Sequence, residues 1–243
     1  MKAILHITIA ITLTFFGVTE SHAQSGNKKV VGNGNVTTKT VNTSDYDAIE
    51  GVGSMDVHLQ KGTEGNITVT TDDNLHEYII VEVKDNRLVV KIKKNTYLKT
   101  NKGIHVTVPF QDISKVALVG SGDIDSKDTV KADNLKVYVT GSGDVVLDVE
   151  ANTLRAKVAG SGDMKLSGTT RDLEVSVAGS GDFHGFALSA QNTEASVAGS
   201  GDVKVIANNS IKARVSGSGD IVYKGNPEHS DTKTSGSGDI DSY

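Results

Sequence analysis

Apolar and polar residues alternate with a period of two through most of the second half of the chain. A representative stretch is Leu173-Glu174-Val175-Ser176-Val177, in which single charged or polar residues separate the apolar ones. The same alternation precedes Val158 and Val215. A period of two is typical of a β-strand with one buried face. The pattern therefore predicts strands over this half of the chain.

The tetrapeptide Gly-Ser-Gly-Asp interrupts this alternation at nearly constant intervals of 21, 19, 19, 20, 18 and 19 residues. In every copy the residue after the aspartate is apolar. Repetition with a fixed period of this length indicates stacked units, each made of a strand, a corner, a second strand and a return loop. The copies begin at Gly120, Gly141, Gly160, Gly179, Gly199, Gly217 and Gly236.

These repeats predict an all-β fold, namely a right-handed parallel β-helix or β-solenoid with coils of about 19 residues. Like residues of successive coils would then lie in columns, about 4.8 Å apart. The inward residues are small or β-branched and few are aromatic, which suits a thin and tightly wound interior. An antiparallel sandwich of repeated hairpins is the alternative.

Composition divides the chain into four segments. Residues 1–23 combine an early lysine, an uncharged apolar run and small residues at the end, which is the layout of a secretory signal peptide cut after Ala23. Residues 24–44 are polar and are expected to form a flexible N-terminal segment. Residues 45–119 alternate less regularly and are expected to form an irregular β region that caps the solenoid of residues 120–243.

The signal peptide predicts export to the periplasm, the cell surface or the medium. No membrane span is expected after its cleavage, because no later apolar run is long enough. The chain has no cysteine, so packing and hydrogen bonds must hold it together. Its net charge of −5 argues against a nucleic-acid partner. The charge is uneven: residues 77–115 hold eight Lys/Arg against four Asp/Glu, and residues 120–243 hold twelve against eighteen.

The aspartates of the corners are the candidate metal ligands. Glycine permits a positive φ, and Ser and Asp bond to nearby backbone N–H groups, so a repeated structural turn accounts for the motif. In a solenoid these aspartates would form a column of carboxylates that repel by about 1 kcal/mol per pair in water. A bound Ca²⁺ or a nearby lysine would relieve the repulsion. The calcium candidates are Asp123, Asp144, Asp163, Asp182, Asp202, Asp220 and Asp239.

The remaining candidate groups give no catalytic pattern. There is no thiol nucleophile, no zinc-ligand spacing and no phosphate-binding loop. A polysaccharide-acting β-helix enzyme is the rival hypothesis, because acidic pairs such as Asp123 with Asp125 occur. The coil length varies by only three residues, however, which leaves no long loops to build a cleft. We therefore predict that the protein is not an enzyme. The histidines after residue 23 are scattered along the sequence: His58, His76, His105, His184 and His229.

Three features together resemble a known family: the segment Gly53-Ser54-Met55-Asp56-Val57, the strand Ile104-His105-Val106-Thr107-Val108-Pro109 that leads to the first full corner, and the serial Gly-Ser-Gly-Asp copies. From Tyr46 onward the chain resembles the head GIN domain proteins, described as "putative auto-transporter adhesins". The resemblance implies a β-helical fold in exported bacterial envelope proteins. It also implies adhesion, and it brings no catalytic residues with it.

We therefore expect an exported, non-enzymatic envelope protein that presents a repetitive surface to a glycan or a protein through many weak contacts. The alternative is a periplasmic scaffold that self-associates through the edge of its last coil. The lysines of residues 91–94 with Lys99 and Lys102 are candidates for contact with an anionic glycan or a phospholipid head group, although a solvated strand face also explains them.

Overall fold

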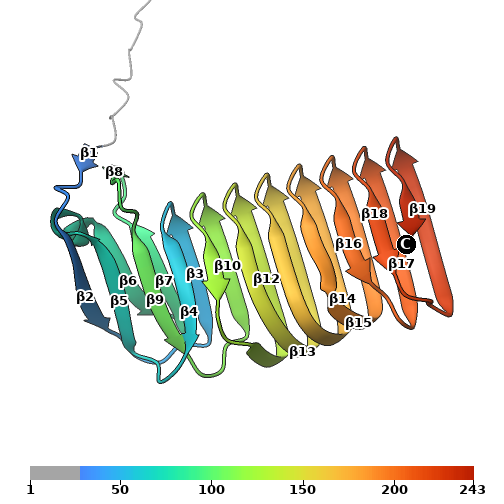
Figure 1. The fold of residues 1–243 in the computed structure, drawn as a ribbon, viewed down its shortest axis with the longest axis horizontal. Coiled ribbons are helices and arrows are strands. Elements are labelled where there is room, and N and C mark those ends of the chain that lie inside the picture. The colour runs from blue at the N-terminus through green and yellow to red at the C-terminus, as the bar shows by residue number, and fades with distance from the viewer. Residues whose placement is uncertain (1–27) are drawn as a thin grey trace, which may run out of the picture.

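The computed structural model describes residues 28–243 of the chain. It is 69% strand and 3% helix, arranged as stacked parallel coils of about 19 residues in a β-solenoid of about seven turns (Figure 1). The predicted β-solenoid is thus confirmed, and the antiparallel sandwich is excluded. The predicted signal peptide, with its cut after Ala23, lies outside the described residues.

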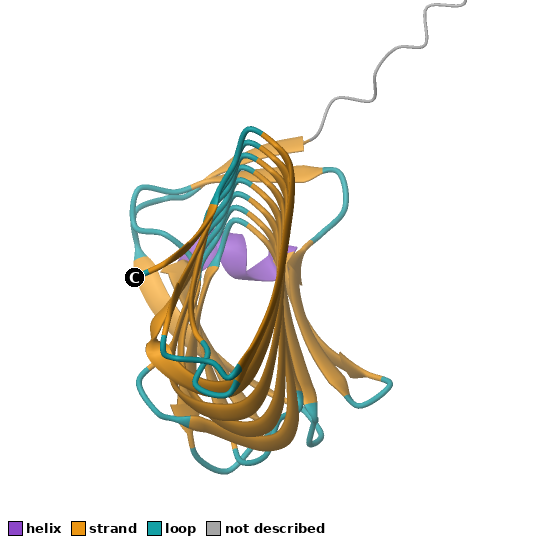
Figure 2. Cartoon of the chain, turned by 90° about the vertical axis from the view of Figure 1, so that its right-hand side faces the viewer, coloured by secondary structure: helices purple, strands orange, loops and turns teal. Residues whose placement is uncertain are grey.

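Each coil has a strand that enters the corner and a strand that leaves it. Three long strands, β13 to β15, do both, because they leave one corner, curve around the far end of the coil and enter the next (Figure 2). The entering strands are β3 (Ala48–Gly53), β10 (Lys115–Gly120), β12 (Val130–Gly141), β13 (Val145–Gly160), β14 (Met164–Gly179), β15 (Phe183–Gly199), β17 (Ser210–Gly217) and β19 (His229–Gly236). The separate leaving strands are β4 (Asp56–Lys61), β11 (Ile124–Ser126), β16 (Val203–Ile206), β18 (Ile221–Lys224) and β20 (Ile240–Ser242).

Successive coils pair in parallel and residue for residue. Val158 lies between Val139 and Val177, for example, and all three are buried. The one shift of register between β14 and β15 falls between Lys165 and Ser167, where β15 carries an extra residue. That insertion accounts for the 20-residue spacing at this point. The matching of like residues explains why the sequence alternation is so regular.

The N-terminal cap places strands in an order that differs from their order in the chain. The β3–β4 coil lies between β10–β11 on one side and a coil made of β7 and β9 on the other. Antiparallel strands then close this end, with β6 on β7, β5 on β9 and β2 on β5. The elements of the cap are β2 (Val36–Asn42), β5 (Asn66–Asp72), the 3₁₀ helix η1 (Asp73–Tyr78), β6 (Ile79–Lys84), β7 (Arg87–Ile92) and β9 (His105–Phe110).

A separate two-stranded parallel sheet of β1 (Lys28–Val31) and β8 (Thr96–Lys99) lies at the cap end (Figure 1). The structure describes residues 28–44 of the segment that was expected to be flexible. These residues contain β1 and β2, because their backbones pair with β8 and β5. Backbone pairing is continuous across residues 119 and 120, so the division of the chain at that point stays a description of the sequence pattern.

The corner glycines are required by the close approach of successive coils. Each first glycine of a corner has a positive φ, as at Gly160 (128°). A Cβ atom there would lie 2.2 Å from the carbonyl oxygen of Gly141, and one at Gly162 would lie 2.1 Å from that of Gly143. No real Cβ can approach a carbonyl oxygen so closely. Glycine is therefore the residue that allows the coils to stack at pairing distance.

The first corner, Gly53 to Asp56, departs from the motif at one position, where Met55 replaces the second glycine. Met55 is fully buried, and its methyl group lies close to Gly53 together with the side chain of Ile92 from β7. On this side, residues 93–104 join β7 to β9 without forming such a corner. A side chain fits at Met55 because no neighbouring corner occupies the space, and it closes the cap end of the corner column.

We expect Gly162→Ala to lower the free energy of unfolding by about 3 kcal/mol or more, because the new methyl group must push two coils apart. Gly62→Ala is the matched control, since its Cβ would lie at an ordinary 3.6 Å from Pro109. The control should stay within about 0.5 kcal/mol of the wild type. Urea unfolding followed by circular dichroism measures both, and equal losses would contradict this account of the corner.

Candidate functional site

The corner aspartates form a hydrogen-bonded ladder. The Oδ1 atom of each aspartate accepts the backbone N–H of the aspartate in the next coil, at distances between 2.8 and 3.2 Å. The structure thus brings all seven calcium candidates into one column, and it adds Asp56 at the cap end. The column consists of Asp56, Asp123, Asp144, Asp163, Asp182, Asp202, Asp220 and Asp239.

The ladder shows how the fold tolerates a column of carboxylates. A hydrogen bond to a charged acceptor contributes about 1.5–3 kcal/mol, against a repulsion of about 1 kcal/mol between neighbouring carboxylates at this spacing in water. The backbone N–H groups therefore offset the repulsion that a cation would otherwise have to relieve. Within residues 28–243, no group of three or more His, Cys, Asp or Glu side chains is placed to hold a metal ion. Calcium binding by the column stays a hypothesis.

Two histidines that are far apart in the sequence meet where β4, β9 and β11 lie side by side. His58 Nδ1 lies 2.7 Å from Asp125 Oδ2, and His58 Nε2 lies 3.2 Å from His105 Nδ1. His105 Nε2 lies 3.1 Å from the carbonyl oxygen of Lys102. The fold thus brings together two of the histidines that are scattered along the sequence. Asp56 also faces His105, with 3.6 Å between its Oδ2 and the ring Nδ1.

The geometry of the pair suits a shared proton. The ring planes are within 18° of each other, and the 5.5 Å between the centroids equals the 3.2 Å contact plus one ring radius at each end. The two nitrogens therefore point at each other along the line between the rings, as in an N–H···N hydrogen bond. Zinc would need lone pairs that converge on a point about 2.0–2.1 Å from each nitrogen. The rings make three contacts at hydrogen-bond distance: with Asp125, with each other and with the carbonyl oxygen of Lys102. All three are hydrogen bonds only when the four ring nitrogens carry three protons between them.

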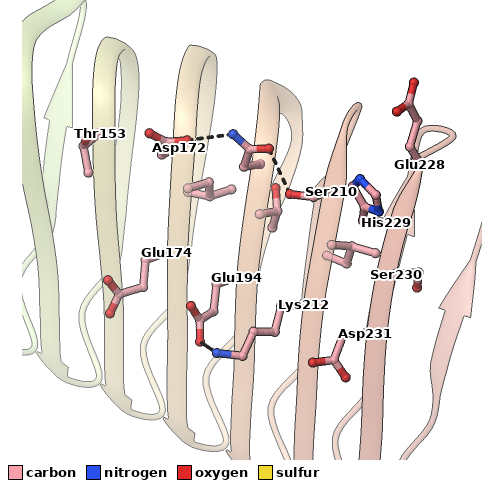
Figure 3. A pocket seen from close by; sticks show the side chains of 14 residues that line it. Thr153, Asp172, Glu174, Glu194, Ser210, Lys212, Glu228, His229, Ser230 and Asp231 are labelled. Carbon is pink, nitrogen blue, oxygen red and sulfur yellow. Dashed lines mark hydrogen bonds and ion pairs between the residues drawn. The ribbon is translucent and has the colours of Figure 1, made fainter.

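A groove of about 720 Å³ crosses β13, β14, β15, β17 and β19 on one side of the solenoid (Figure 3). Two polar rows border it, and an inward-facing row lies between them. The first row consists of Thr153, Asp172, Asn192, Ser210 and His229, each paired in register with the next. The second row consists of Arg155, Glu174, Glu194, Lys212 and Asp231, paired in the same way.

Hydrogen bonds along the first row fix its side chains. Asn192 donates from Nδ2 to Asp172 Oδ1 at 2.8 Å and accepts at its Oδ1 from the Ser210 hydroxyl at 2.9 Å. The hydrogen bond from Asn192, followed by that from Arg171, lowers the pKa of Asp172. In the second row, Lys212 bonds to Glu194 at 2.6 Å.

Ion pairs neutralise most of the carboxylates of the groove. Its lining carries five carboxylates, on Asp172, Glu174, Glu194, Glu228 and Asp231. Four of them pair with a cation: Asp172 with Arg171, Glu174 with Arg155, Glu194 with Lys212 and Asp231 with Arg214. The bond from Arg214 lowers the pKa of Asp231, so this carboxylate also stays ionised at mildly acidic pH. Ligands with hydroxyl groups therefore find hydrogen-bond acceptors along the groove.

The sequence contains signals for both sites that motif reasoning missed. The rows of the groove stand seven and five residues before successive corners, from the corner at Gly160 to that at Gly236. Alignment of the corner at Gly53 with that at Gly120 also places His58 and Asp125 opposite each other, each two residues after the corner aspartate. His105 had no such signal, because its strand reaches β4 only through the order of strands in the cap.

We expect Asp163→Ala to lower the free energy of unfolding by about 2 kcal/mol, because the N–H of Asp182 loses its acceptor. Asp163→Asn should cost less, since an amide oxygen can still accept that bond. Thermal melts of both variants and the wild type, with millimolar Ca²⁺ or with EDTA, measure this. A calcium-dependent rise in the wild type that Asp163→Ala abolishes would contradict the architectural role and support a metal site.

Asn192→Ala should raise the pKa of Asp172, because it removes the hydrogen bond that contributes most to the lowering. A pH titration of the Asp172 carboxyl carbon by NMR measures the change directly. Asn208→Ala is the control, because Asn208 bonds to Ser189 and not to Asp172. An unchanged pKa in Asn192→Ala would contradict the assigned network.

Comparison with known proteins finds a matching family and solved structures of similar fold. A family described as "Putative auto-transporter adhesin, head GIN domain" matches residues 45–227. No curated protein matches the chain.

Solved structures from Bacteroides and Parabacteroides species share the fold over most of the chain. A "putative adhesin" from Bacteroides fragilis NCTC 9343 is 27% identical, with a TM-score of 0.84, and the match covers 88% of this chain and 100% of that one. A "putative lipid binding protein" from Parabacteroides distasonis ATCC 8503 is 28% identical, with a TM-score of 0.75 and coverage of 89% and 100%. A "putative adhesin" from the same strain is 26% identical, with a TM-score of 0.72 and the same coverage.

Proposed function

Because the chain belongs to the family described as "Putative auto-transporter adhesin, head GIN domain", we propose that it is an exported, adhesin-like binding module of the cell envelope. The observation that carries the proposal is the groove across β13 to β19, with its two polar rows. The groove would hold a glycan or a protein segment. No enzymatic step is part of this function.

Backbone pairing supports a binding role for the groove, because it presents the rows rigidly and at regular intervals. Neighbouring members of a row are one coil apart, which is about 4.8 Å. Carboxylates accept hydrogen bonds, and the amide of Asn192 and the hydroxyl of Ser210 can both donate and accept them. A chain of sugars offers hydroxyl groups of both kinds along its length. Many such weak contacts add through multivalency.

The charge of the groove narrows the ligand class. The groove lining offers five carboxylates, four of which are in ion pairs, so the groove favours a neutral glycan over a densely sulfated or phosphorylated polymer. A polar protein segment can use the same hydrogen-bonding groups and is the other form of ligand in this proposal.

The state of the groove carboxylates supports binding over catalysis. Glycoside hydrolysis requires a carboxylic acid with a raised pKa as proton donor. In the groove, hydrogen bonds instead lower the pKa of Asp172 and Asp231. The surface is formed by strands of nearly equal coil length, so no loop wall surrounds a reacting bond. These observations favour a surface that binds its target without changing it chemically.

Export rests on the signal-peptide layout of residues 1–23. Within residues 28–243, no helix combines the length and the apolar character needed to cross a bilayer. Together with the family, the signal-peptide layout supports a location in the periplasm or at the cell surface.

Self-association is the second candidate function, and the exposure of β19 along its whole length favours it. The inward positions of this coil are polar, however: Ser230 and Thr232 stand in register with Ile211 and Ala213 of the preceding coil. Pairing through this edge would therefore depend on backbone hydrogen bonds with little apolar burial. Sedimentation velocity over a range of concentrations distinguishes a self-associating scaffold from a monomeric binding module.

We expect the double variant Asp172→Asn/Glu194→Gln to lose glycan binding by at least about tenfold, because it removes two acceptor charges without changing side-chain shape. An array of neutral, amino-substituted and anionic glycans, probed with wild type and variant, measures this.

The matched control is Asp133→Asn/Glu150→Gln, which changes the same kinds of contact outside the groove. Asp133 bonds to Asn152 as Asp172 bonds to Asn192, and Glu150 pairs with Lys131 as Glu194 pairs with Lys212. The control should bind as the wild type does. Glycan binding that the groove variant retains, or that both variants lose equally, would count against the groove.

A further inference from the structure

The outer face of the β1–β8 sheet joins apolar and basic side chains. Lys29 lies opposite Tyr97, and Val31 lies opposite Lys99 in the register of the two strands. Side chains two residues apart on a strand share a face, so these four lie together. Tyr97 and Val31 are 58% and 56% exposed. The other face packs inward, where Leu98 is buried.

The surroundings of this face are strongly basic. Residues 86–111 contain six Lys/Arg and no Asp or Glu. Of these six, the ion pairs found among residues 28–243 involve only Arg87, with Glu50, and Lys91, with Glu82. Lys94, in the turn before β8, is exposed. We call the group of Lys29, Val31, Lys94, Tyr97 and Lys99 the basic tip.

A buried carboxylate holds the basic tip in place. Asp72 accepts a hydrogen bond from the N–H of Gly34, after β1, and another from the hydroxyl of Thr100, after β8. Asp72 is only 2% exposed, and it anchors the segments that follow both strands to β5. The basic tip is therefore a fixed surface, so little ordering is needed when it binds.

The pattern fits an anionic bilayer surface better than a solvated strand edge. Lysines that only protect an edge from pairing do not require exposed apolar neighbours. Tyrosine and valine, by contrast, gain by entering the boundary between head groups and acyl chains, where tyrosine is enriched in membrane proteins. Lysines beside them can reach anionic phosphates while their stems stay on the apolar surface.

We propose that the basic tip docks the protein on an anionic lipid bilayer. The cap lies at one end of the long axis and the groove strands β17 and β19 lie toward the other (Figure 1). Residues 120–243 carry a net charge of −6, from twelve Lys/Arg against eighteen Asp/Glu, and the surface repels them. The molecule therefore stands with its cap on the membrane and its groove away from it. This docking does not depend on which ligand the groove holds.

Flotation of the chain that begins at Gln24 with lipid vesicles tests the proposal. We expect binding to phosphatidylcholine vesicles that contain about 30 mol % phosphatidylglycerol, and none to pure phosphatidylcholine vesicles. Lys29→Gln/Lys94→Gln/Lys99→Gln should weaken binding about 100-fold, at about fivefold per lysine. Tyr97→Ser should weaken it by a smaller factor that high salt does not remove, since that contribution is apolar.

The matched control is Val146→Ser/Lys165→Gln, which removes an exposed valine and the lysine that pairs with it in register on the solenoid. This control should bind as the wild type does, and thermal melts should show that every variant is folded. Absence of wild-type binding to the anionic vesicles, or equal binding by the triple lysine variant, would overturn the proposal. So would tip-dependent binding to heparin without vesicle binding, which would make an anionic polysaccharide the partner.

Discussion

Each corner joins two coils through hydrogen bonds that run in both directions, and the rest of the molecule depends on this contact. The carbonyl oxygen of Gly141 accepts the N–H groups of Ser161 and Gly162 from the next coil, while the N–H of Val145 donates to the carbonyl of Asp163. The aspartate ladder adds a side-chain bond at the same place. These bonds form only because the glycines of the corner carry no Cβ atom to meet the carbonyl oxygen of the preceding coil. Once they form, most side chains of a coil lie beside their equivalents in the next.

This register is the reason why the regular part of the fold could be predicted from sequence. The glycines fix the corners, and the alternation around Leu173 and Val175 fixes which side chains point inward. The groove rows were also accessible, because Asp172 and Asn192 stand at the same distance before their corners. Their residue types change from coil to coil, however, so they form no repeated motif such as that of the corners. The proposed binding surface consists of the positions at which coils of the same shape differ.

The cap could not be predicted in the same way, because its contacts are not local. The β3–β4 coil precedes in sequence both of the coils that flank it, so strands from two later parts of the chain pair with its two sides. No spacing rule links His58 to His105 or Lys29 to Tyr97, since these pairs are neighbours only because β9 pairs with β4 and β8 pairs with β1. Met55 is the exception, since a methionine in place of a corner glycine marks a coil with an open side.

Identical contacts between successive coils also make the length of the molecule independent of the chemistry at its two ends. A further coil inserted between β12 and β13 would meet the same glycine carbonyl on one side and the same aspartate N–H on the other. Each such insertion would move the groove about 4.8 Å farther from the cap and leave both surfaces intact. Gain or loss of whole repeats would thus change the distance between the cap and the groove in steps of fixed size. The solenoid would then act as a spacer whose length can change without a change at either end.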